Sequence, residues 1–264
     1  MRLAVKHLTE YRYDAPVSYA LQRLRLVPQP SPAQAILSWE IEIEGADKEV
    51  VFRDHFGNET WLLSAHGAPH MIRVSAEGVV ETTDTAGVCA AAESLVPLWF
   101  YLRGTSLTTA DRAIAAFAAR YREDEPLAGL HALMGAMGEH LTFDQTATAS
   151  VTKAADAWQL GRGVCQDYTH IFCAAARSIG IPARYVSGYL MLDDRIEQTA
   201  SHAWAEAHVE GLGWVGFDAA NGIAPDERYV RLAIGLDYRD AAPVSGIRFG
   251  FSEESLAVHV HVEQ

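Results

Sequence analysis

The chain has 264 residues, of which 49% are hydrophobic and 21% are charged, and its formal net charge at pH 7 is −13. This composition is typical of a globular protein with a sizeable core. The acidic balance and the absence of a long run of lysine or arginine argue against nucleic acids and anionic membranes as partners, because both require clustered cations.

The first 85 residues carry strand patterns. Residues 36–44 alternate, with Trp39, Ile41 and Ile43 on one face and glutamates on the other, which predicts a strand with one buried side. Residues 50–53 and 61–63 flank a turn at Gly57-Asn58 and predict a hairpin. Residues 71–80 predict a further strand. We therefore predict an N-terminal, β-sandwich-like domain over residues 1–85.

Helical patterns begin after residue 104. Thr108 or Thr109 is the expected cap of a first helix, and residues 130–141 carry the apolar stripe of a second. A third helix is expected to start near Cys165 and to stop at Gly180 and Pro182. Strands are expected over 184–190, 202–209, 214–218 and 256–262, with a loop over 193–199. These elements predict an α+β core domain over residues 86–264, in which helices pack on an antiparallel sheet.

The segment from Gly161 to Tyr168 places a cysteine between a glycine-rich turn and the start of a helix. A thiol becomes a good nucleophile when its anion is stabilised, and unpaired N–H groups at a helix start and a nearby histidine can do so. His202 and Asp218 are expected on neighbouring strands of one hairpin, where the carboxylate can accept the imidazole N–H. The sequence thus predicts thiol acyl-transfer chemistry with Cys165 as nucleophile.

The remaining cysteines, Cys89 and Cys173, are expected to be structural. The three cysteines match neither a disulfide framework nor paired zinc ligands. No signal-peptide pattern and no membrane-spanning stretch occur, so we expect a reduced, cytoplasmic protein.

Other uses of these residues find less support. Potential ligands are present, but their spacing fits no known metal motif, so no metal or cofactor is expected; the donors considered are Cys165, His170, His202, His208 and Asp218. No Gly-x-Ser-x-Gly element indicates a serine hydrolase. A fold used only for binding or assembly is the alternative function, because a fold does not fix an activity.

The core motifs, Gly161 to Asp167, Ser201 to Trp204 and Trp214 to Asp218, resemble those of the bacterial transglutaminase-like superfamily of cysteine peptidases and acyltransferases. Residues 7–13, 22–28 and 54–58 resemble its N-terminal β domain, and residues 229–240 and 243–246 the segment after its core. One departure is Ala219-Ala220, where the family often has proline and threonine. The resemblance covers nearly the whole chain.

The resemblance implies a papain-like core with Cys165 as nucleophile, His202 as general base and acid, and Asp218 as the residue that orients His202. It implies a peptide or protein substrate, a thioester on Cys165, and release by water or by a primary amine. The backbone N–H of Cys165 is expected in the oxyanion hole, with Gln159, Trp158 and Trp204 as candidates for oxyanion or substrate contacts. The calcium dependence of the animal members is not expected, because no acidic loop with the required spacing is present. The oligomeric state is not predicted.

Overall fold

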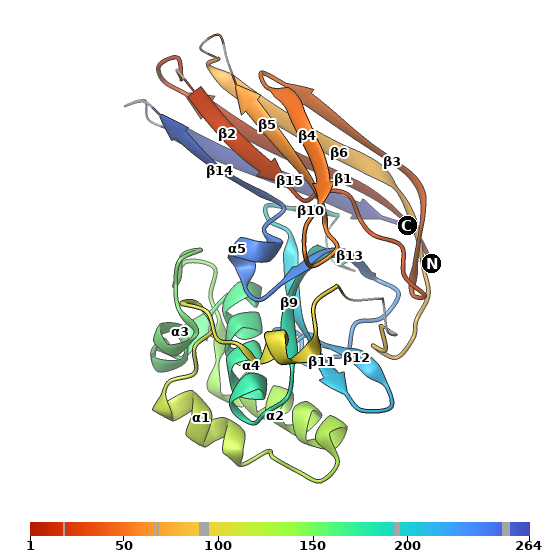
Figure 1. The fold of residues 1–264 in the computed structure, drawn as a ribbon, viewed down its shortest axis with the longest axis vertical. Helices are drawn as coiled ribbons and strands as arrows, with labels where there is room; N and C mark the ends of the chain where they lie inside the picture. The colour runs from red at the N-terminus through yellow and green to blue at the C-terminus, as the bar shows by residue number, and fades with distance from the viewer. Residues whose placement is uncertain (18, 66, 68, 90–94, 193–195, 250–253) are drawn as a thin grey trace.

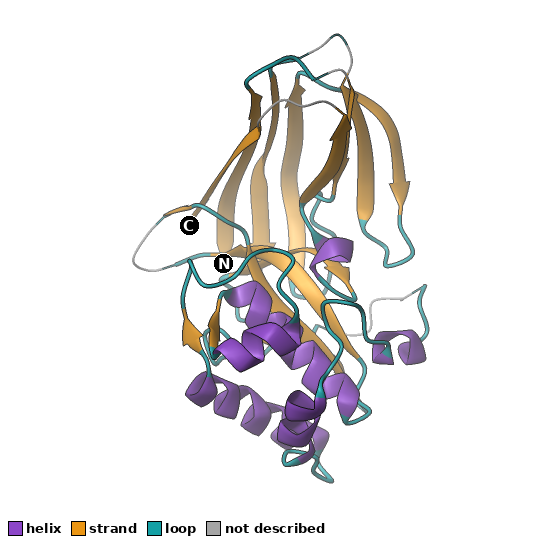
Figure 2. Ribbon diagram, turned by 90° about the vertical axis from the view of Figure 1, so that its left-hand side faces the viewer, coloured by secondary structure: helices purple, strands orange, loops and turns teal. Residues whose placement is uncertain are grey.

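The computed structural model describes residues 1–264 except 18, 66, 68, 90–94, 193–195 and 250–253. A β sandwich forms one end of the molecule, and an α+β core forms the other (Figure 1). In the view turned by 90°, the helices gather below the strands of the sandwich (Figure 2). The predicted α+β class with strands before the core is confirmed.

Two antiparallel sheets form the sandwich. The five-stranded sheet has the order β10-β15-β1-β6-β3 and consists of β1 (Arg2–Tyr13), β3 (Gln34–Glu44), β6 (Met71–Thr82), β10 (Glu197–Gln198) and β15 (Glu254–Glu263). The four-stranded sheet has the order β14-β2-β5-β4 and consists of β2 (Tyr19–Leu24), β4 (Asp47–Arg53), β5 (Glu59–Ala65) and β14 (Val244–Phe249).

The alternating pattern of β3 packs as predicted, since Trp39, Ile41 and Ile43 lie against the sandwich core. The predicted hairpin is β4 with β5, in which Val51 pairs with Trp61. The sandwich also contains β14 and β15, which follow the core in the chain. The division at residue 85 stays a prediction.

A third antiparallel sheet, with the order β12-β11-β9-β13, forms the centre of the core. Its strands are β9 (Ala183–Leu190), β11 (His202–Val209), β12 (Gly213–Phe217) and β13 (Tyr229–Gly235). Two short parallel strands also pair, β7 (Thr142–Phe143) and β8 (Arg162–Gly163). The helices are η1 (Leu98–Leu102), α1 (Arg112–Ala119), α2 (Pro126–His140), α3 (Ala154–Leu160), α4 (Cys165–Ser178) and α5 (Tyr238–Ala241).

Helix α4 lies against this sheet and buries most of its length. Phe172 stacks on Phe217 of β12, with 5.0 Å between the ring centroids. The apolar flank of the helix therefore fixes Cys165, its first residue, at the end of the sheet.

Two local predictions are wrong. The cap of α1 is Asp111, whose carboxylate accepts the Ile114 N–H at 2.8 Å, whereas the Thr108 hydroxyl contacts Arg177 at 2.7 Å. The expected loop over 193–199 contains β10, which pairs with β15. Residues 193–195 of that loop lie outside the described residues.

Candidate active site

The turn before α4 positions Cys165. Gly161 ends α3 in the left-handed conformation, with φ of 69°, which favours glycine. A Cβ atom on Gly163 would lie 2.5 Å from the carboxylate of Asp167, so only glycine leaves room for that side chain. The glycines of the motif thus serve the geometry of the turn from which Cys165 enters the helix.

Asp167, in the first turn of α4, stabilises this turn by accepting hydrogen bonds. Its Oδ2 accepts the Val164 N–H at 2.8 Å and the Thr148 hydroxyl at 2.6 Å. Burial raises the pKa of Asp167, and these two hydrogen bonds oppose that rise. A carboxylate at this position also interacts favourably with the helix start. Asp167 therefore positions the backbone on which Cys165 lies.

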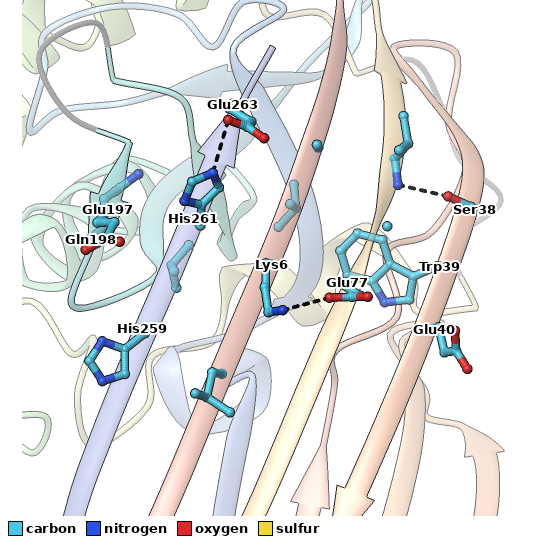
Figure 3. Close-up of a pocket in the computed structure, with 16 residues that line it drawn as sticks. Lys6, Ser38, Trp39, Glu40, Glu77, Glu197, Gln198, His259, His261 and Glu263 are labelled. Carbon is cyan, nitrogen blue, oxygen red and sulfur yellow. Dashed lines mark hydrogen bonds and ion pairs between the residues drawn. The ribbon is translucent and has the colours of Figure 1, made fainter.

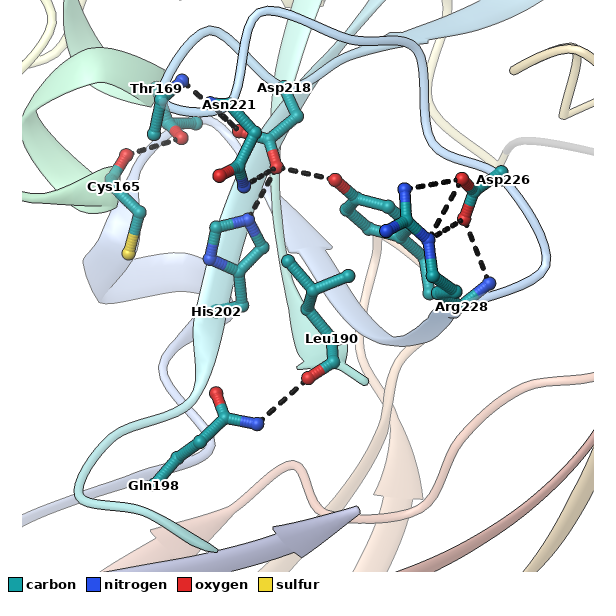
Figure 4. Close-up of polar contacts among 11 residues, drawn as sticks. Cys165, Thr169, Leu190, Gln198, His202, Asp218, Asn221, Asp226 and Arg228 are labelled. Atoms are coloured by element: carbon teal, nitrogen blue, oxygen red, sulfur yellow. Dashed lines mark hydrogen bonds and ion pairs between the residues drawn. The ribbon is translucent and has the colours of Figure 1, made fainter. Parts of the chain in front are cut away.

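His202 and Asp218 meet as the sequence predicted. His202 begins β11 and Asp218 follows β12, and the register of this hairpin pairs Ala205 with Phe217. His202 Nε2 lies 2.6 Å from Asp218 Oδ2. The other ring nitrogen, Nδ1, is on the side of the ring toward Cys165 (Figure 4). The three side chains are thus gathered at one place.

Opposing effects set the charges of this pair. Burial by itself would lower the pKa of His202, but the contacts with Asp218 and Cys165 outweigh burial and raise it to about 10. Burial would likewise raise the pKa of Asp218, yet the hydrogen bond and charge of His202 hold it below its ordinary value. The site therefore favours an imidazolium beside a carboxylate.

Two further residues hold Asp218, and the sequence analysis missed both as site residues. Asn221 Nδ2 and the Tyr229 hydroxyl each donate to Asp218 Oδ2 at 2.7 Å. The backbone N–H groups of Ala220 and Asn221 donate to Oδ1. The turn at 218–221 signals only the backbone part of this network, because an aspartate at the start of a turn accepts N–H groups of the residues that follow. No local signal marks Tyr229, which comes from β13.

The candidates for oxyanion or substrate contacts lie in different surroundings. The ring of Trp158 stacks on His140 at 3.9 Å between centroids and packs on Phe117 at 4.6 Å. Gln159 is exposed. Trp204 is buried beside His202, with ring centroids 6.2 Å apart, and packs edge-on against Tyr229. Their roles stay predictions, and Trp204 forms the wall behind His202.

The other two cysteines lie in surroundings that disfavour a thiolate: Cys173 in the apolar core and Cys89 beside the carboxylate of Glu206. Cys173, on the same helix as Cys165, is completely buried, and burial raises its pKa to about 11. Burial also raises the pKa of Cys89, whose sulfur lies 3.4 Å from Glu206 Oε1. Cys165 is partly exposed. A thiol that is buried and protonated is a poor nucleophile.

A hollow of about 760 Å³ lies away from Cys165, on the outer face of the five-stranded sheet (Figure 3). Strand pairing aligns charged and polar side chains in one row across this face. The row consists of Glu197, His261, Lys6, Glu77 and Glu40. Glu197 and Gln198 of β10 are among the residues that line the hollow. The segment that carries them continues to His202.

Within the described part of the chain, no group of three or more histidine, cysteine, aspartate or glutamate side chains is arranged to hold a metal ion. Over the same residues, no helix has the length and apolar character needed to cross a bilayer.

Comparison with known proteins supports the resemblance in both parts of the chain. Residues 115–219 match the model of the transglutaminase-like superfamily, and residues 3–81 match that of the bacterial transglutaminase-like N-terminal region. An uncharacterised Mycobacterium leprae protein is 30% identical over 99% of this chain and 98% of its own length. An uncharacterised Mycobacterium tuberculosis protein is 28% identical over 97% of this chain and 90% of its own.

Among solved structures, a protein from Cytophaga hutchinsonii, provisionally named a cysteine protease, has a similar fold. The TM-score is 0.80 at 22% identity, and the match covers all of this chain and 90% of that one. The agreement extends over both the sandwich and the core.

Proposed function

Because this chain belongs to the transglutaminase-like superfamily, we propose that it is a cysteine-dependent acyl-transfer enzyme with Cys165, His202 and Asp218 as its catalytic residues. The observation that carries the proposal is the 2.6 Å contact of His202 with Asp218, next to a cysteine at the first position of a helix. The substrate is a peptide or glutamine carboxamide of a polypeptide.

In the resting site His202 holds the proton of Cys165 as an imidazolium. In the first step the Cys165 thiolate attacks the carbonyl carbon of the substrate. A C–S bond forms while the carbonyl electron pair moves to oxygen. Asp218 stabilises the imidazolium, in keeping with the raised pKa of His202. The N–H of Cys165 at the helix start is one donor to the oxyanion, an interaction worth roughly 3 kcal/mol when well aimed.

In the second step the C–N bond breaks, and His202 gives its proton to the departing amine or ammonia. This leaves a thioester on Cys165. Water or a primary amine then attacks the thioester and gives a proton to His202, and the thiolate leaves. Water completes hydrolysis, as in a peptidase or amidase, and an amine completes transfer.

The three unpaired cysteines suit a cytoplasmic location.

The buried state of Asp218 supports an enzyme rather than a binding module. Burying a carboxylate costs free energy unless donors surround it. At Asp218 those donors include the imidazole of His202, whose side chain is only 12% exposed but interacts with the partly exposed Cys165. A scaffold has no need for this arrangement, whereas thiol catalysis requires it.

Alkylation and turnover test the proposal together. Iodoacetamide followed by peptide mapping is expected to modify Cys165 well before Cys89 and Cys173. A glutamine peptide should release ammonia with the wild-type protein and not with Cys165→Ala, which should melt at an unchanged temperature. Incorporation of a labelled primary amine would assign transfer, and its absence alongside ammonia release would assign hydrolysis. Equal, slow alkylation of all three cysteines without turnover would favour the binding module.

A further inference from the structure

Strand β15 is paired on both sides over only part of its length. β1 pairs with it from Glu254 to Glu263. On its other side, β10 pairs only with Val260 and His261. Among the residues that the structure describes, no strand lies opposite residues 254–259 on that side. This stretch of β15 is therefore an open sheet edge.

The backbone groups of this edge can be assigned from one hydrogen bond. The Val262 N–H donates to the Ile196 carbonyl, on the β10 side, at 3.2 Å. Because successive residues of a strand direct their N–H and C=O groups to opposite sides, Leu256 and Val258 direct theirs to the same side as Val262. Leu256 is 54% exposed. An exposed edge with backbone groups directed outward is a template for another strand.

The open edge borders the candidate active site. β15 contacts β9 of the core sheet, and its C-terminal part pairs with β10. After Gln198 the chain leaves this sheet and reaches His202 at the start of β11. The edge therefore begins where the chain turns toward the catalytic histidine, and Gln198 lies below His202 in the view of Figure 4.

Tyr238 connects the site with the edge. Cys165 and Tyr238 pack on the same cluster, which contains Tyr185. Tyr11 pairs with Leu256 of β15. Burial raises the pKa of Tyr11, and Tyr238 contributes to that rise, so the two phenols are close enough to interact. Tyr238, which packs beside Cys165, therefore lies near the paired strands β1 and β15 at the level of Leu256.

We propose that the open edge of β15 over residues 254–259 binds an extended segment of the polypeptide substrate, which adds to the five-stranded sheet as a strand in line with β10. Main-chain hydrogen bonds to Leu256 and Val258 hold the segment, and the neighbouring residues are directed to Cys165. The placement of the neighbouring substrate residues at Cys165 rests on the proposed function. The binding of the segment to the edge of β15 does not.

The surroundings of the edge define the kind of segment that fits. Side chains of an added strand alternate between the two faces of the sheet. On one face they meet Leu256 and Val258, which favour apolar residues. On the other they meet His259, at the border of the hollow of Figure 3. The segment is therefore extended, free of proline at the bonded positions, and apolar at every second residue.

Amide hydrogen exchange by NMR tests the binding on the Cys165→Ala protein. The probe is reduced, carboxymethylated casein, because main-chain pairing depends little on sequence. At nine-tenths saturation, exchange at Leu256 and Val258 should slow about tenfold. Exchange at Ala257, whose N–H is directed to β1, should not change. Unchanged exchange at Leu256 and Val258 would overturn the proposal. Slowing without casein that grows with protein concentration would assign the edge to a second copy of this chain, and would also overturn it.

A pair of variants tests the consequence for turnover. Leu256→Pro removes both the side chain and the outward N–H, whereas Leu256→Ala removes only the side chain. On casein, kcat/KM of the proline variant should be roughly fivefold below that of the alanine variant, as expected for one hydrogen bond. A small activated ester should be hydrolysed equally by both. Equal kcat/KM on casein would overturn the proposal. An inactive wild type would instead count against the proposed function, and the exchange pattern would still report on the edge.

Discussion

Two buried carboxylates in the hairpin region of the core serve different ends. Asp218 and Glu206 are both fully buried. Asp218 is bonded to His202, a base that can gain and lose a proton. Glu206 is bonded to the guanidinium of Arg184 at 2.6 Å and lies 3.3 Å from that of Arg231. Arginine remains charged at any ordinary pH.

The difference shows that the partner, rather than burial, decides what a buried carboxylate can do. The pKa of Glu206 is lowered because its two arginines outweigh burial. Arg184 also lies over the ring of Trp214, at 3.9 Å, so the cluster is fixed by packing as well as by charge. A carboxylate paired with permanently charged arginines, such as Glu206, contributes to the structure. A carboxylate paired with a histidine, such as Asp218, can support proton transfer in a reaction.

The largest effect is expected from Asp218→Asn. The amide keeps the size of the carboxylate but cannot stabilise an imidazolium at His202. We expect kcat/KM for a glutamine peptide to fall on the order of 10³- to 10⁴-fold. Steady-state rates will check this, with the alkylation rate of Cys165 as a second measurement.

Asp226→Asn is the matched control for that change. Asp226 is a partly exposed carboxylate in the same connection, bonded to Arg228 at 2.7 Å. Its substitution should leave kcat/KM within about twofold, as for a surface ion pair. Comparable losses in the two variants would mean that the role of Asp218 is not specific.

Glu206→Gln is expected to act on stability instead. The substitution leaves the buried Arg184 and the partly buried Arg231 without their counter-charge, which should lower the free energy of unfolding by about 3–5 kcal/mol. Urea unfolding will measure this loss. Turnover per alkylatable Cys165 should remain near the wild-type value. A stable Glu206→Gln protein with a large loss of turnover would reverse the assignment of the two carboxylates.

Histidines extend the comparison to a buried base. The ring nitrogens of His7 contact the hydroxyls of Tyr189 and Thr9, at 2.9 and 2.8 Å, and burial lowers its pKa to about 4. Because the unfolded chain binds a proton near pH 6.5 and the folded chain does not, stability should fall as the pH drops from 6.5 to 4. The full effect is about 3 kcal/mol. His7→Asn should remove that part of the acid loss, measured by urea unfolding at pH 7 and pH 4.5.

His202 should show the opposite dependence. Its pKa is raised to about 10, so its contribution to stability is present below pH 6.5 and is lost as the pH rises through about 10. His202→Asn should therefore flatten the alkaline side of the stability curve. It should also reduce the acid loss tied to Asp218, because His202 holds the pKa of that carboxylate down. The comparison would be contradicted if His7→Asn and His202→Asn changed the acid and alkaline parts of the stability curve in the same way.

The sequence predicted those parts of the site that depend on local pattern. Cys165 is the first residue of α4 because a glycine turn precedes an amphipathic run. His202 and Asp218 come together because a short hairpin places both on neighbouring strands. Tyr229 could not be found this way, since its contact depends on how β13 packs beside the hairpin.

The same limit applies to the fold. Local alternation predicted strands in the first 85 residues and at the chain's end. It could not predict that Val262 pairs with Val5, or that β10 joins the same sheet. Pairing between distant segments depends on surfaces formed only after the chain folds, and no nearby residue carries that information.

The smallest effect, and the finest test of the comparison, is expected from Tyr229→Phe. This change removes one hydroxyl donor from Asp218 and leaves His202 and Asn221 in contact with it. A hydrogen bond to a charged group contributes about 1.5–3 kcal/mol, and the remaining donors will compensate in part. We therefore expect kcat to fall about tenfold with little change in KM.

Tyr189→Phe is the matched control, because it removes a buried tyrosine hydroxyl that contacts His7 and not Asp218. It should lower the free energy of unfolding by about 1 kcal/mol and leave kcat unchanged. If both variants lose stability and neither loses rate, Tyr229 supports the fold alone. A loss of rate confined to Tyr229→Phe would show that the donors around a buried carboxylate are tuned to the histidine it serves.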